Sequence, residues 1–430
     1  MPSGADGMAA DGRSDRDTLQ TPAGAAAWLR SAAAVRARAN AMLALAERDA
    51  LEHFRLHSER LDAAADHVIE TIRQRYPSLE IPFHSRWRHF DTGGIDRWGD
   101  LAGTLDPECQ AAERARVRFD LAVTSVLLDA GAGDRWHYRE PGSGVLFTRS
   151  EGLAVASFHA FRKGLFSASA EDPLRTDAAA LATVTGESLG RAFQVDPDNP
   201  LVGLEERAAL MCRLATALQS RPGMFGAENP RVGHLFDYLA TNARSGRIPA
   251  PAILDALLAG LDGIWPGRPA LGGIELGDVW RHPAIEAPDA TDGWVPFHKL
   301  SQWLAYSLVE PLEEAGIRVT DLDALTGLPE YRNGGLLIDL GVLAVRDRDA
   351  LTAAHAVDSV LVVEWRALTV ALLDRLADRI RTRLGMTREQ IPLMSILEGG
   401  TWQAGRRIAR ERRGEAAPPP LRVISDGTVF

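Results

Sequence analysis

The stretch VLVVEWRALTVALL, residues 360–373, predicts a helix that is buried on all of its faces. Apolar residues point in nearly every direction around this helix, and Glu364 and Arg366 are its only charged residues. Residues two positions apart on a helix point in nearly opposite directions, so these two charges cannot pair with each other. Because a buried charge without a partner costs several kcal/mol, each needs a partner from another segment. Either they tie the helix to its neighbours or they face a functional site, and both interpretations remain open.

The rest of the chain also favours helices. Residues 25–75 are rich in Ala, Leu, Arg and Glu and contain no Gly or Pro, which predicts a helical hairpin or one long helix. Another helix is expected over residues 108–128, whereas residues 76–103 have no clear period and are expected to form a loop. Strand signals are limited to GVLF at residues 144–147, LLIDLGVLAV at 336–345 and the last few residues. The predicted fold class is therefore mainly α, with few short strands.

No change in composition is sharp enough to divide the chain into two domains. Residues 1–22 are small, polar and rich in Gly and Asp, so we expect a disordered tail. Residues 23–430 are expected to form a single large helical domain. Within it we place an N-terminal helical part at about 23–150 and a catalytic part at about 272–430.

Composition and missing motifs argue against several classes of function. A formal net charge of -10 over 430 residues gives no general electrostatic basis for binding nucleic acid. No stretch has the pattern of a secretory signal or a membrane span, so a cytoplasmic location is expected. The motifs of Rossmann nucleotide binding, P-loops, α/β-hydrolases and zincins are missing. We predict no cofactor and no metal, since His84, His89 and Asp91 come nearest to a metal cluster at an irregular spacing. The oligomeric state is left open.

The segment LPEYRNGG, residues 328–335, is the first candidate for a functional site. Glu330, Tyr331 and Arg332 follow a proline and precede Asn-Gly-Gly, so we expect them on a constrained turn. A turn that merely separates two helices would explain the proline and the glycines but not the Glu-Tyr-Arg cluster between them. This cluster therefore favours a site.

A second candidate is the segment VPFHKLSQWLAYSL, residues 295–308. Lys299, Gln302 and Tyr306 are spaced by three and four residues, which places them on one face of a helix. Such a polar stripe is either a solvated surface or part of a site, and Gln and Tyr are uncommon choices for a solvated surface. His298 is a weaker candidate, because a lone histidine more often packs or caps a helix.

Glu398 in SILEGGTW, residues 395–402, is the third candidate. It ends an apolar run and is followed by two glycines, which permit close approach of the backbone, and by Trp402. In apolar and aromatic surroundings the charged carboxylate is disfavoured, which predicts the raised pKa that acid/base chemistry uses. An ordinary helix end capped by Gly399 is the alternative.

These segments belong to long blocks that carry a family resemblance. The blocks are SRWRHFDTGG, RVRFDLAVTSVLLDAG, RSEGLAVASF, GDVWRH, VPFHKLSQWLAYSL, LTGLPEYRNGG, VVEWRALTVALLDRLA, ILEGGTW and SDGTVF. Through them the chain closely resembles the uracil-catabolism Urc/Urg family of fungi and bacteria, long catalogued as a domain of unknown function. The resemblance implies a role in a pathway that opens the uracil ring and releases urea, with ribosylurea as a proposed intermediate.

A fainter resemblance concerns the chemistry. The order FHKLSQ, LPEYRNGG, VVEWRAL and ILEGGTW looks like that of the queuosine nucleoside N-glycosylase family, which implies a helical fold related to DNA glycosylases. By position, Lys299 and Gln302 would shape the pocket, and Glu330 with Arg332 would hold the sugar. Glu364 and Arg366 would brace the site. Glu398 would take the place of the catalytic aspartate, although Glu replaces Asp at both acidic positions and the spacing to the tryptophan differs.

Together these observations predict a hydrolase of N-glycosyl bonds that acts on a small ribosyl substrate, ribosylurea or its 5′-phosphate. Cleavage of the bond builds positive charge on the ribose, which a carboxylate stabilises while a second acidic group handles a proton. The predicted catalytic residues are Glu398 and Glu330, and the predicted substrate contacts are Arg332, Lys299, Gln302, Tyr331, Trp402, Glu364, Arg366, His298 and Asp339. For a 5′-phosphate, Lys299, Arg332, Arg406 or Arg407 could supply the cation. A uracil phosphoribosyltransferase and a non-catalytic scaffold or regulator of the pathway are the alternatives.

Overall fold

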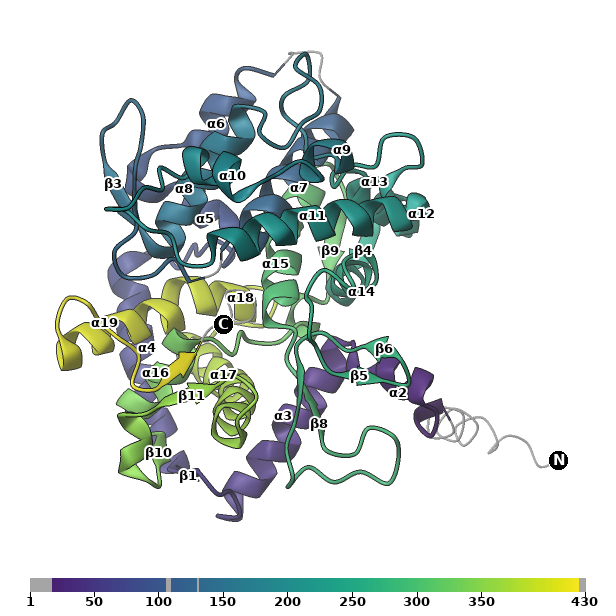
Figure 1. The fold of residues 1–430 in the computed structure, drawn as a ribbon. Coiled ribbons are helices and arrows are strands. Elements are labelled where there is room, and N and C mark those ends of the chain that lie inside the picture. The colour runs from purple at the N-terminus through teal and green to yellow at the C-terminus, as the bar shows by residue number, and fades with distance from the viewer. Residues whose placement is uncertain (1–17, 106–109, 130, 425–430) are drawn as a thin grey trace.

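The stretch that begins at Val360 forms helix α17 (Val360–Leu384) in the computed structural model, which describes residues 18–105, 110–129 and 131–424. The helix is buried on every face from Leu361 to Leu373, as predicted. The side chain of Ser359 caps its first turn, and Gly385 ends it in the left-handed conformation. Helix α17 packs along α3 (Ala32–Glu47) and α4 (Leu61–Arg75), so it forms the centre of the core (Figure 1).

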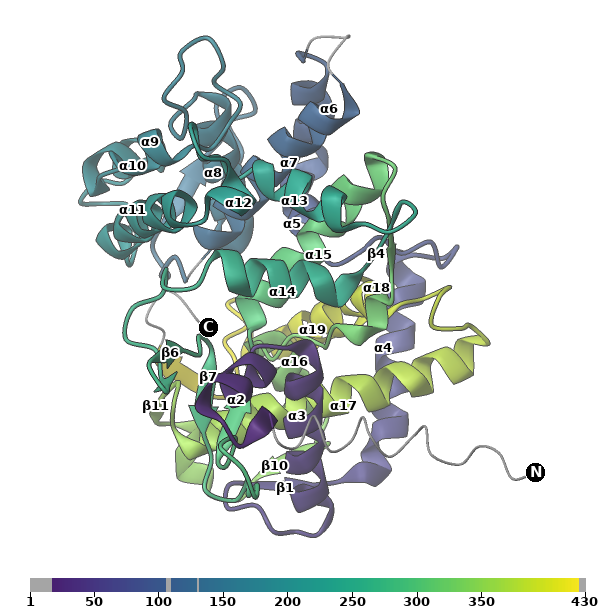
Figure 2. The same ribbon diagram turned by 90° about the vertical axis from the view of Figure 1, so that its right-hand side faces the viewer.

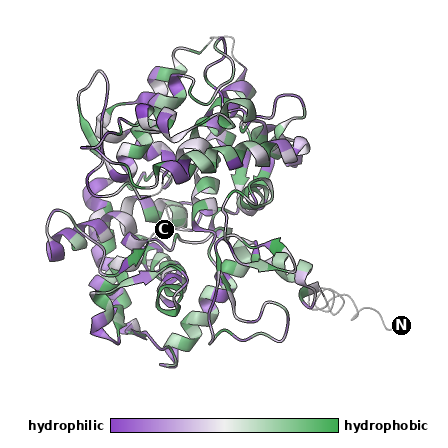
Figure 3. Ribbon diagram, in the orientation of Figure 1, coloured by the Kyte–Doolittle hydropathy of each residue, from purple (hydrophilic) through white to green (hydrophobic). Residues whose placement is uncertain are grey.

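The fold is mainly α, which confirms the predicted class. Besides α3, α4 and α17, the helices of at least seven residues are α2 (Pro22–Leu29), α7 (Ala111–Leu127), α8 (Arg149–Arg162), α10 (Gly186–Ala192), α11 (Leu204–Ser220), α13 (His234–Asn242), α14 (Ala250–Gly260), α15 (Lys299–Glu314), α16 (Tyr331–Asp339) and α19 (Trp402–Arg413). The shorter helices are α5 (Arg86–Phe90), α6 (Arg97–Ala102), α9 (Ala178–Leu181), α12 (Pro222–Phe225) and α18 (Leu393–Ile396). Most of these helices carry both hydrophobic and hydrophilic stretches (Figure 3), as expected for amphipathic helices around a shared core.

Strands occur in the described residues only as short pairs that join distant segments. The antiparallel pairs are β1 (Phe54–Leu56) with β10 (Leu343–Val345), β2 (His137–Arg139) with β3 (Leu146–Thr148), β5 (Ala270–Leu271) with β6 (Ile274–Glu275), and β7 (Val279–Arg281) with β8 (Trp294–Pro296). The parallel pairs are β4 (Arg247–Pro249) with β9 (Arg318–Thr320), and β11 (Ala354–Ala356) with β12 (Arg422–Ile424). The strand signal at 144–147 is confirmed by β3. At 336–345 only the end is a strand, because LLID belongs to α16.

The first half of the chain differs from the expectation at two places. The predicted hairpin or single helix over residues 25–75 is interrupted twice, since Ser31 caps the start of α3 and β1 separates α3 from α4. Residues 76–103 are not a loop throughout but contain α5 and α6. These helices have only five and six residues, too few for a hydrophobic period to show in the sequence. The predicted tail, residues 1–22, falls largely outside the described residues, and Thr21 caps α2.

Two groups of helices make up the molecule. Helices α5 to α13 gather in the upper part of Figures 1 and 2, and α3, α4, α16 and α17 lie in the lower part, with α14 and α15 between them. Helix α15 packs against α7 and α14 and also against α5, so it lies between the two groups. In the described residues no helix is long and apolar enough to cross a membrane.

Candidate active site

The two charges in the fully buried part of α17, Glu364 and Arg366, tie this helix to neighbouring segments. Glu364 is fully buried, and its carboxylate accepts hydrogen bonds from the backbone N–H groups of Glu52 (3.2 Å) and His53 (3.0 Å). The guanidinium of Arg366 donates two hydrogen bonds to Asp278, at 2.8 and 2.7 Å, and lies 4.1 Å from the centre of the Phe297 ring. Each charge thus has its own partner, as the two-residue spacing predicts. Both residues therefore join α17 to distant segments of the chain.

Asp278 connects α17 to the start of α15. Besides the hydrogen bonds from Arg366, its carboxylate accepts one from the backbone N–H of Lys299 (3.1 Å) and one from the indole of Trp280 (2.8 Å). Burial raises the pKa of Asp278, but the charge and hydrogen bonds of Arg366 and the bond from Trp280 outweigh burial and lower this pKa to about 2. Asp278 is therefore an anion that holds the first turn of α15 in place. It lies in the GDVWRH block, to which sequence reasoning assigned no role.

Replacing Asp278 by Asn is expected to lower the free energy of unfolding at pH 7 by about 3–5 kcal/mol, because buried Arg366 would lose its carboxylate partner. The pKa of Asp278 is lower in the folded protein than in the unfolded chain. Its stabilisation is therefore complete above a pH of about 4 and is lost as the pH falls toward 2. Denaturant unfolding at pH 7 and at pH 3 measures this, and the gap between wild type and variant should shrink at pH 3. A difference between wild type and variant that is equal or larger at pH 3 would contradict this role of Asp278. The control is Asp66→Asn, which removes a carboxylate from an exposed ion pair.

Glu330 begins helix α16 rather than lying on a turn. Its carboxylate accepts hydrogen bonds from the backbone N–H groups of Arg332 (2.7 Å) and Asn333 (2.5 Å), which caps the helix. The expected turn is wrong because the two glycines serve packing: a Cβ on Gly334 would lie 2.7 Å from the Trp365 ring of α17. Burial raises the pKa of Glu330, although these bonds and the charges of Lys299 and Arg332 act in the opposite direction.

Lys299 is the first residue of α15 and lies near Glu330. Burial lowers the pKa of its ammonium group, while the negative charges of Glu330 and Asp129 raise it. Within residues 18–105, 110–129 and 131–424 this ammonium makes no hydrogen bond and no ion pair. Lys299 and Glu330 thus influence each other without being bound together, which leaves both able to bind a ligand.

Glu398 lies in a π-helical turn, Leu397–Thr401, that joins α18 to α19. The helix continues through Gly399 and Gly400, so Gly399 is not a cap; a Cβ on these glycines would lie 2.8 Å from Ile81 and 2.7 Å from Val68. Turns of this kind inside helices often mark functional sites. Glu398 is therefore positioned by an irregular helical turn. The two glycines allow this turn to pack closely against α4 and the loop after it.

The predicted raised pKa of Glu398 is wrong. Burial raises the pKa, but the hydrogen bond with His84, whose Nδ1 lies 2.8 Å from the carboxylate, together with the charges of His84, His89 and Arg75, brings it below the ordinary value. Glu398 and His84 are 7% and 6% exposed, so water screens this interaction little. Glu398 is accordingly an anion at neutral pH.

Sequence reasoning considered His84 and His89 only as part of a metal cluster and missed the group of residues around His84, which comes from the segments HSRWRHFD and RSEG. The His84 ring lies 6.4 Å from the ring of Trp303 and 6.3 Å from that of Trp402. Burial and the charge of Arg86 lower the pKa of His89 to about 4, so this histidine is neutral at pH 7. The further members are Arg86, which lies 3.2 Å from Asp129, and Glu151, which lies 2.9 Å from Arg406. The crowding of His, Arg and Trp in HSRWRHFD was the only sequence signal for them.

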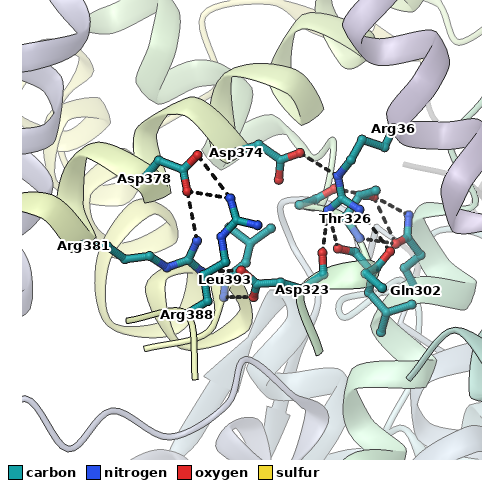
Figure 4. Close-up of polar contacts among 12 residues, drawn as sticks. Arg36, Gln302, Asp323, Thr326, Asp374, Asp378, Arg381, Arg388 and Leu393 are labelled. Carbon is teal, nitrogen blue, oxygen red and sulfur yellow. Dashed lines mark hydrogen bonds and ion pairs between the residues drawn. The ribbon is translucent and has the colours of Figure 1, made fainter. Parts of the chain in front are cut away.

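Several predicted substrate contacts are occupied within the protein. The Gln302 amide donates hydrogen bonds to Phe297 O (3.0 Å) and to the Thr326 hydroxyl (2.7 Å), and accepts one from Thr326 N (2.8 Å), as Figure 4 shows in part. Asp339 accepts two hydrogen bonds from Arg413, at 2.7 and 2.5 Å, and a His298 ring nitrogen bonds Leu29 O at 2.8 Å. We assign these three residues to the fold. The two Arg candidates in α19 are also paired, Arg406 with Glu151 and Arg407 with Glu70.

A separate charged cavity of about 420 Å³ lies between α3, α17 and the segment at Asp323. Most of the charged side chains that line it are paired with each other (Figure 4): Arg36 donates to Asp374 at 2.8 Å, and Arg381 donates to Asp323 at 2.5 Å. Asp323 also accepts a hydrogen bond from the backbone N–H of Leu393 (2.7 Å). The contacts join α17 to the start of α18, so we read this network as structural.

Two groups of candidate residues are left. The first group is Glu330, Tyr331, Arg332 and Lys299, and the second is Glu398, His84 and Trp402. Helix α16 of the first group packs against α19 and contacts the π-helical turn of the second group, so these elements are neighbours. Within the described residues no group of three or more His, Cys, Asp and Glu side chains could hold a metal ion.

Comparison with known proteins gives the family. A family model described as "Protein of unknown function (DUF1688)" matches residues 28–430. The chain belongs to the DUF1688 family. It is 39% identical to "Protein urg3" of Schizosaccharomyces pombe over 402 residues, which cover 92% of this chain and 96% of that relative. It is 38% identical to "Uracil catabolism protein 4" of Lachancea kluyveri over 408 residues, covering 88% and 92%. The site described above lies wholly within the part that matches the DUF1688 family.

The carboxyls of Glu330 and Glu398 are pushed in opposite directions. Burial raises the pKa of Glu330, and His84 together with nearby positive charge lowers that of Glu398. Two carboxyls whose pKa values are driven apart are suited to divide the roles of acid and base.

Proposed function

We propose that this protein takes part in uracil catabolism as an N-glycosidase, which hydrolyses the N-ribosidic bond of ribosylurea or its 5′-phosphate. The pathway is supported by the relative that is named "Uracil catabolism protein 4". The reaction class is supported by one observation above all, the two buried carboxyls with opposite pKa shifts. We propose a small ribosyl compound, and not a nucleic acid, as the binding partner.

In the proposed reaction Glu398 acts as the anion. As the bond between ribose C1′ and the urea nitrogen breaks, positive charge builds on the ribose, and the Glu398 carboxylate stabilises it. A water molecule adds its oxygen to C1′ and gives its proton to Glu398. His84 holds the carboxylate in its charged form through the 2.8 Å contact. His84 is thus a positioning residue.

Glu330 acts as the acid. Urea leaves as a neutral molecule only if its nitrogen gains a proton, and a carboxyl with a raised pKa can supply it. Both oxygens of Glu330 accept backbone N–H bonds, which fixes the carboxyl in position while its remaining lone pairs stay available. After urea leaves, the proton from Glu398 returns to Glu330 through solvent, which balances the cycle.

A substrate survey tests the reaction class. Purified protein is incubated with ribosylurea, with its 5′-phosphate, with UMP, and with uracil plus phosphoribosyl diphosphate, and urea, uracil and UMP are assayed. We expect urea from at least one of the ribosylureas and no formation of UMP. Formation of UMP would replace the proposal by a phosphoribosyltransferase, and no turnover in any of the four would favour a non-catalytic role.

A further inference from the structure

His89 of α5 has one ring nitrogen bound and the other available. Its Nδ1 lies 3.1 Å from Nη1 of Arg86. A guanidinium group can only donate, so Nδ1 must accept this hydrogen bond. Burial and the charge of Arg86 lower the pKa of His89 to about 4, so the ring is neutral at pH 7 and its one proton lies on Nε2. Among residues 18–105, 110–129 and 131–424 this Nε2 has no partner, so it is an unused N–H donor.

Trp303 of α15 carries a second unused donor. Its indole is 6% exposed, and in the described residues its buried Nε1–H has no hydrogen-bond partner. An unpaired buried N–H costs about 1–3 kcal/mol, which a ligand with an acceptor can recover. The indoles of Trp265 and Trp294 are also unpaired, so a missing partner alone does not mark a site. Of these three indoles, only that of Trp303 has ring contacts with histidines within the described part of the chain.

The ring of Trp303 contacts both histidines of the site. Its centre lies 6.4 Å from that of the His84 ring, at an interplanar angle of 29°. It lies 5.6 Å from the centre of the His89 ring, at an angle of 65°. His84 in turn contacts the carboxylate of Glu398 at 2.8 Å. The two unused donors therefore lie on neighbouring rings, and His84 joins Trp303 to the carboxylate that we propose as the anion of the reaction.

This group of rings is buried on one side and open on the other. Arg86, in the same short helix as His89, is fully buried, whereas His89 itself is partly exposed. Trp402, whose ring lies 6.3 Å from that of His84, is partly exposed as well. A ligand that reaches Glu398 past Trp402 can therefore also meet the ring of His89.

The charges around the two donors favour a neutral ligand. The positive charge of Arg86 is compensated by Asp129, at 3.2 Å. Glu398 is an anion, and it would repel a ligand group of negative charge. The donors of His89 and Trp303 are themselves neutral. A neutral group with an acceptor oxygen, such as a carbonyl, fits this arrangement best.

We propose that His89 and Trp303 donate hydrogen bonds to the carbonyl oxygen of the urea group in the substrate. This proposal rests on the proposed N-glycosidase function and adds two residues that touch the leaving group. As the bond between ribose C1′ and the urea nitrogen breaks, its electron pair moves onto the urea, partly to the carbonyl oxygen. Two N–H donors stabilise this charge until the nitrogen gains its proton from Glu330. A carbonyl oxygen has two lone pairs and can accept from both donors.

The first test compares His89→Leu, which removes the donor, with His89→Gln, which keeps an N–H. For hydrolysis of the ribosylureas we expect His89→Leu to lower kcat/KM about a hundredfold, and His89→Gln to lower it much less. In p-nitrophenyl ribofuranoside no carbonyl adjoins the bond that breaks, so both variants should cleave it nearly as fast as wild type. His137→Leu is the matched control, because His137 is also partly exposed but lies in β2, and it should keep both activities.

The second test removes the indole N–H and keeps an aromatic ring. Trp303→Phe should lower kcat/KM for the ribosylureas about tenfold, whereas Trp294→Phe, at an equally buried and unpaired indole, should not. Thermal unfolding checks that the two variants are similarly stable. Urea at millimolar concentration should inhibit the cleavage of p-nitrophenyl ribofuranoside. Its inhibition constant should rise about tenfold in Trp303→Phe and in His89→Leu.

Nitrogen NMR of the histidine rings observes the His89 donor directly. We expect its proton on Nε2, and we expect millimolar urea to shift this signal; a proton on Nδ1 would overturn the proposal. If His89→Leu slows the ribosylureas and p-nitrophenyl ribofuranoside alike, or slows neither, the donor pair is wrong and the N-glycosidase stands. If wild type hydrolyses no ribosyl compound but urea still shifts the signal, the reaction is wrong and the urea site stands. If there is neither hydrolysis nor a shift, both are wrong.

Discussion

Glu398→Gln is expected to lower the turnover number for urea release by about 10²–10⁴-fold. The amide has nearly the shape of the carboxylate but carries no charge, so it cannot stabilise the positive ribose or accept the proton from water. Because substrate binding relies on other residues, KM should change much less than kcat. Steady-state kinetics of wild type and variant measure this, with thermal unfolding as the check on folding. A matched control is Glu389→Gln, at an exposed glutamate outside the site.

The contact between His84 and Glu398 gives this prediction a pH signature. His84 helps to hold the pKa of Glu398 below its ordinary value, so activity should fall only at low pH, where Glu398 becomes protonated. His84→Phe removes the hydrogen bond and the charge, which raises the pKa of Glu398. The acidic limb of the kcat/KM profile should therefore move to higher pH in this variant. An unmoved limb would show that His84 does not control the ionisation of Glu398.

Glu330→Gln is expected to lower kcat by about 10²–10⁴-fold for substrates with a poor leaving group, because glutamine cannot donate a proton to urea. Activity that depends on protonated Glu330 falls as the pH rises through its raised pKa, so the variant should lose the basic limb of the profile. A substrate with a different leaving group tests this role more directly. With p-nitrophenyl ribofuranoside, whose leaving group needs no protonation, Glu330→Gln should lower kcat only slightly. An equal loss for both kinds of substrate would remove Glu330 from the role of acid.

Because Glu330 also caps α16, the loss of the cap must be separated from the loss of the acid. Removing a cap of this kind costs about 0.5–2 kcal/mol of stability. Glu330→Asp keeps a carboxyl that can cap and donate, so it should retain more activity than Glu330→Gln at similar stability. If the Asp and Gln variants lose activity equally, the cap and not the acid explains the effect.

Local features of this structure can be predicted from the sequence, whereas contacts between distant segments cannot. The buried helix at Val360 and the need of Glu364 and Arg366 for separate partners follow from spacing alone, and both are confirmed. Their partners, His53 and Asp278, come from segments 311 and 88 residues away. No local pattern identifies such partners.

The errors at the site have a common physical cause. The glycines after Glu398 and after Asn333 suggest helix ends, whereas both pairs lie inside helical turns because they allow close packing on neighbouring segments. The wrong sign of the pKa shift at Glu398 arises from His84, which lies 314 positions away in the chain. Burial could be predicted from the apolar run around Glu398, but the neighbouring histidine could not.

We propose that the chain cleaves the bond between ribose and urea with the carboxyl pair Glu398 and Glu330. The most direct measurement is to quantify urea and ribose 5-phosphate released from ribosylurea 5′-phosphate by wild type and by Glu398→Gln. We expect equal amounts of the two products from wild type and a rate about 10²–10⁴-fold lower for the variant. Unequal products, or a folded Glu398→Gln variant that works as fast as wild type, would contradict it.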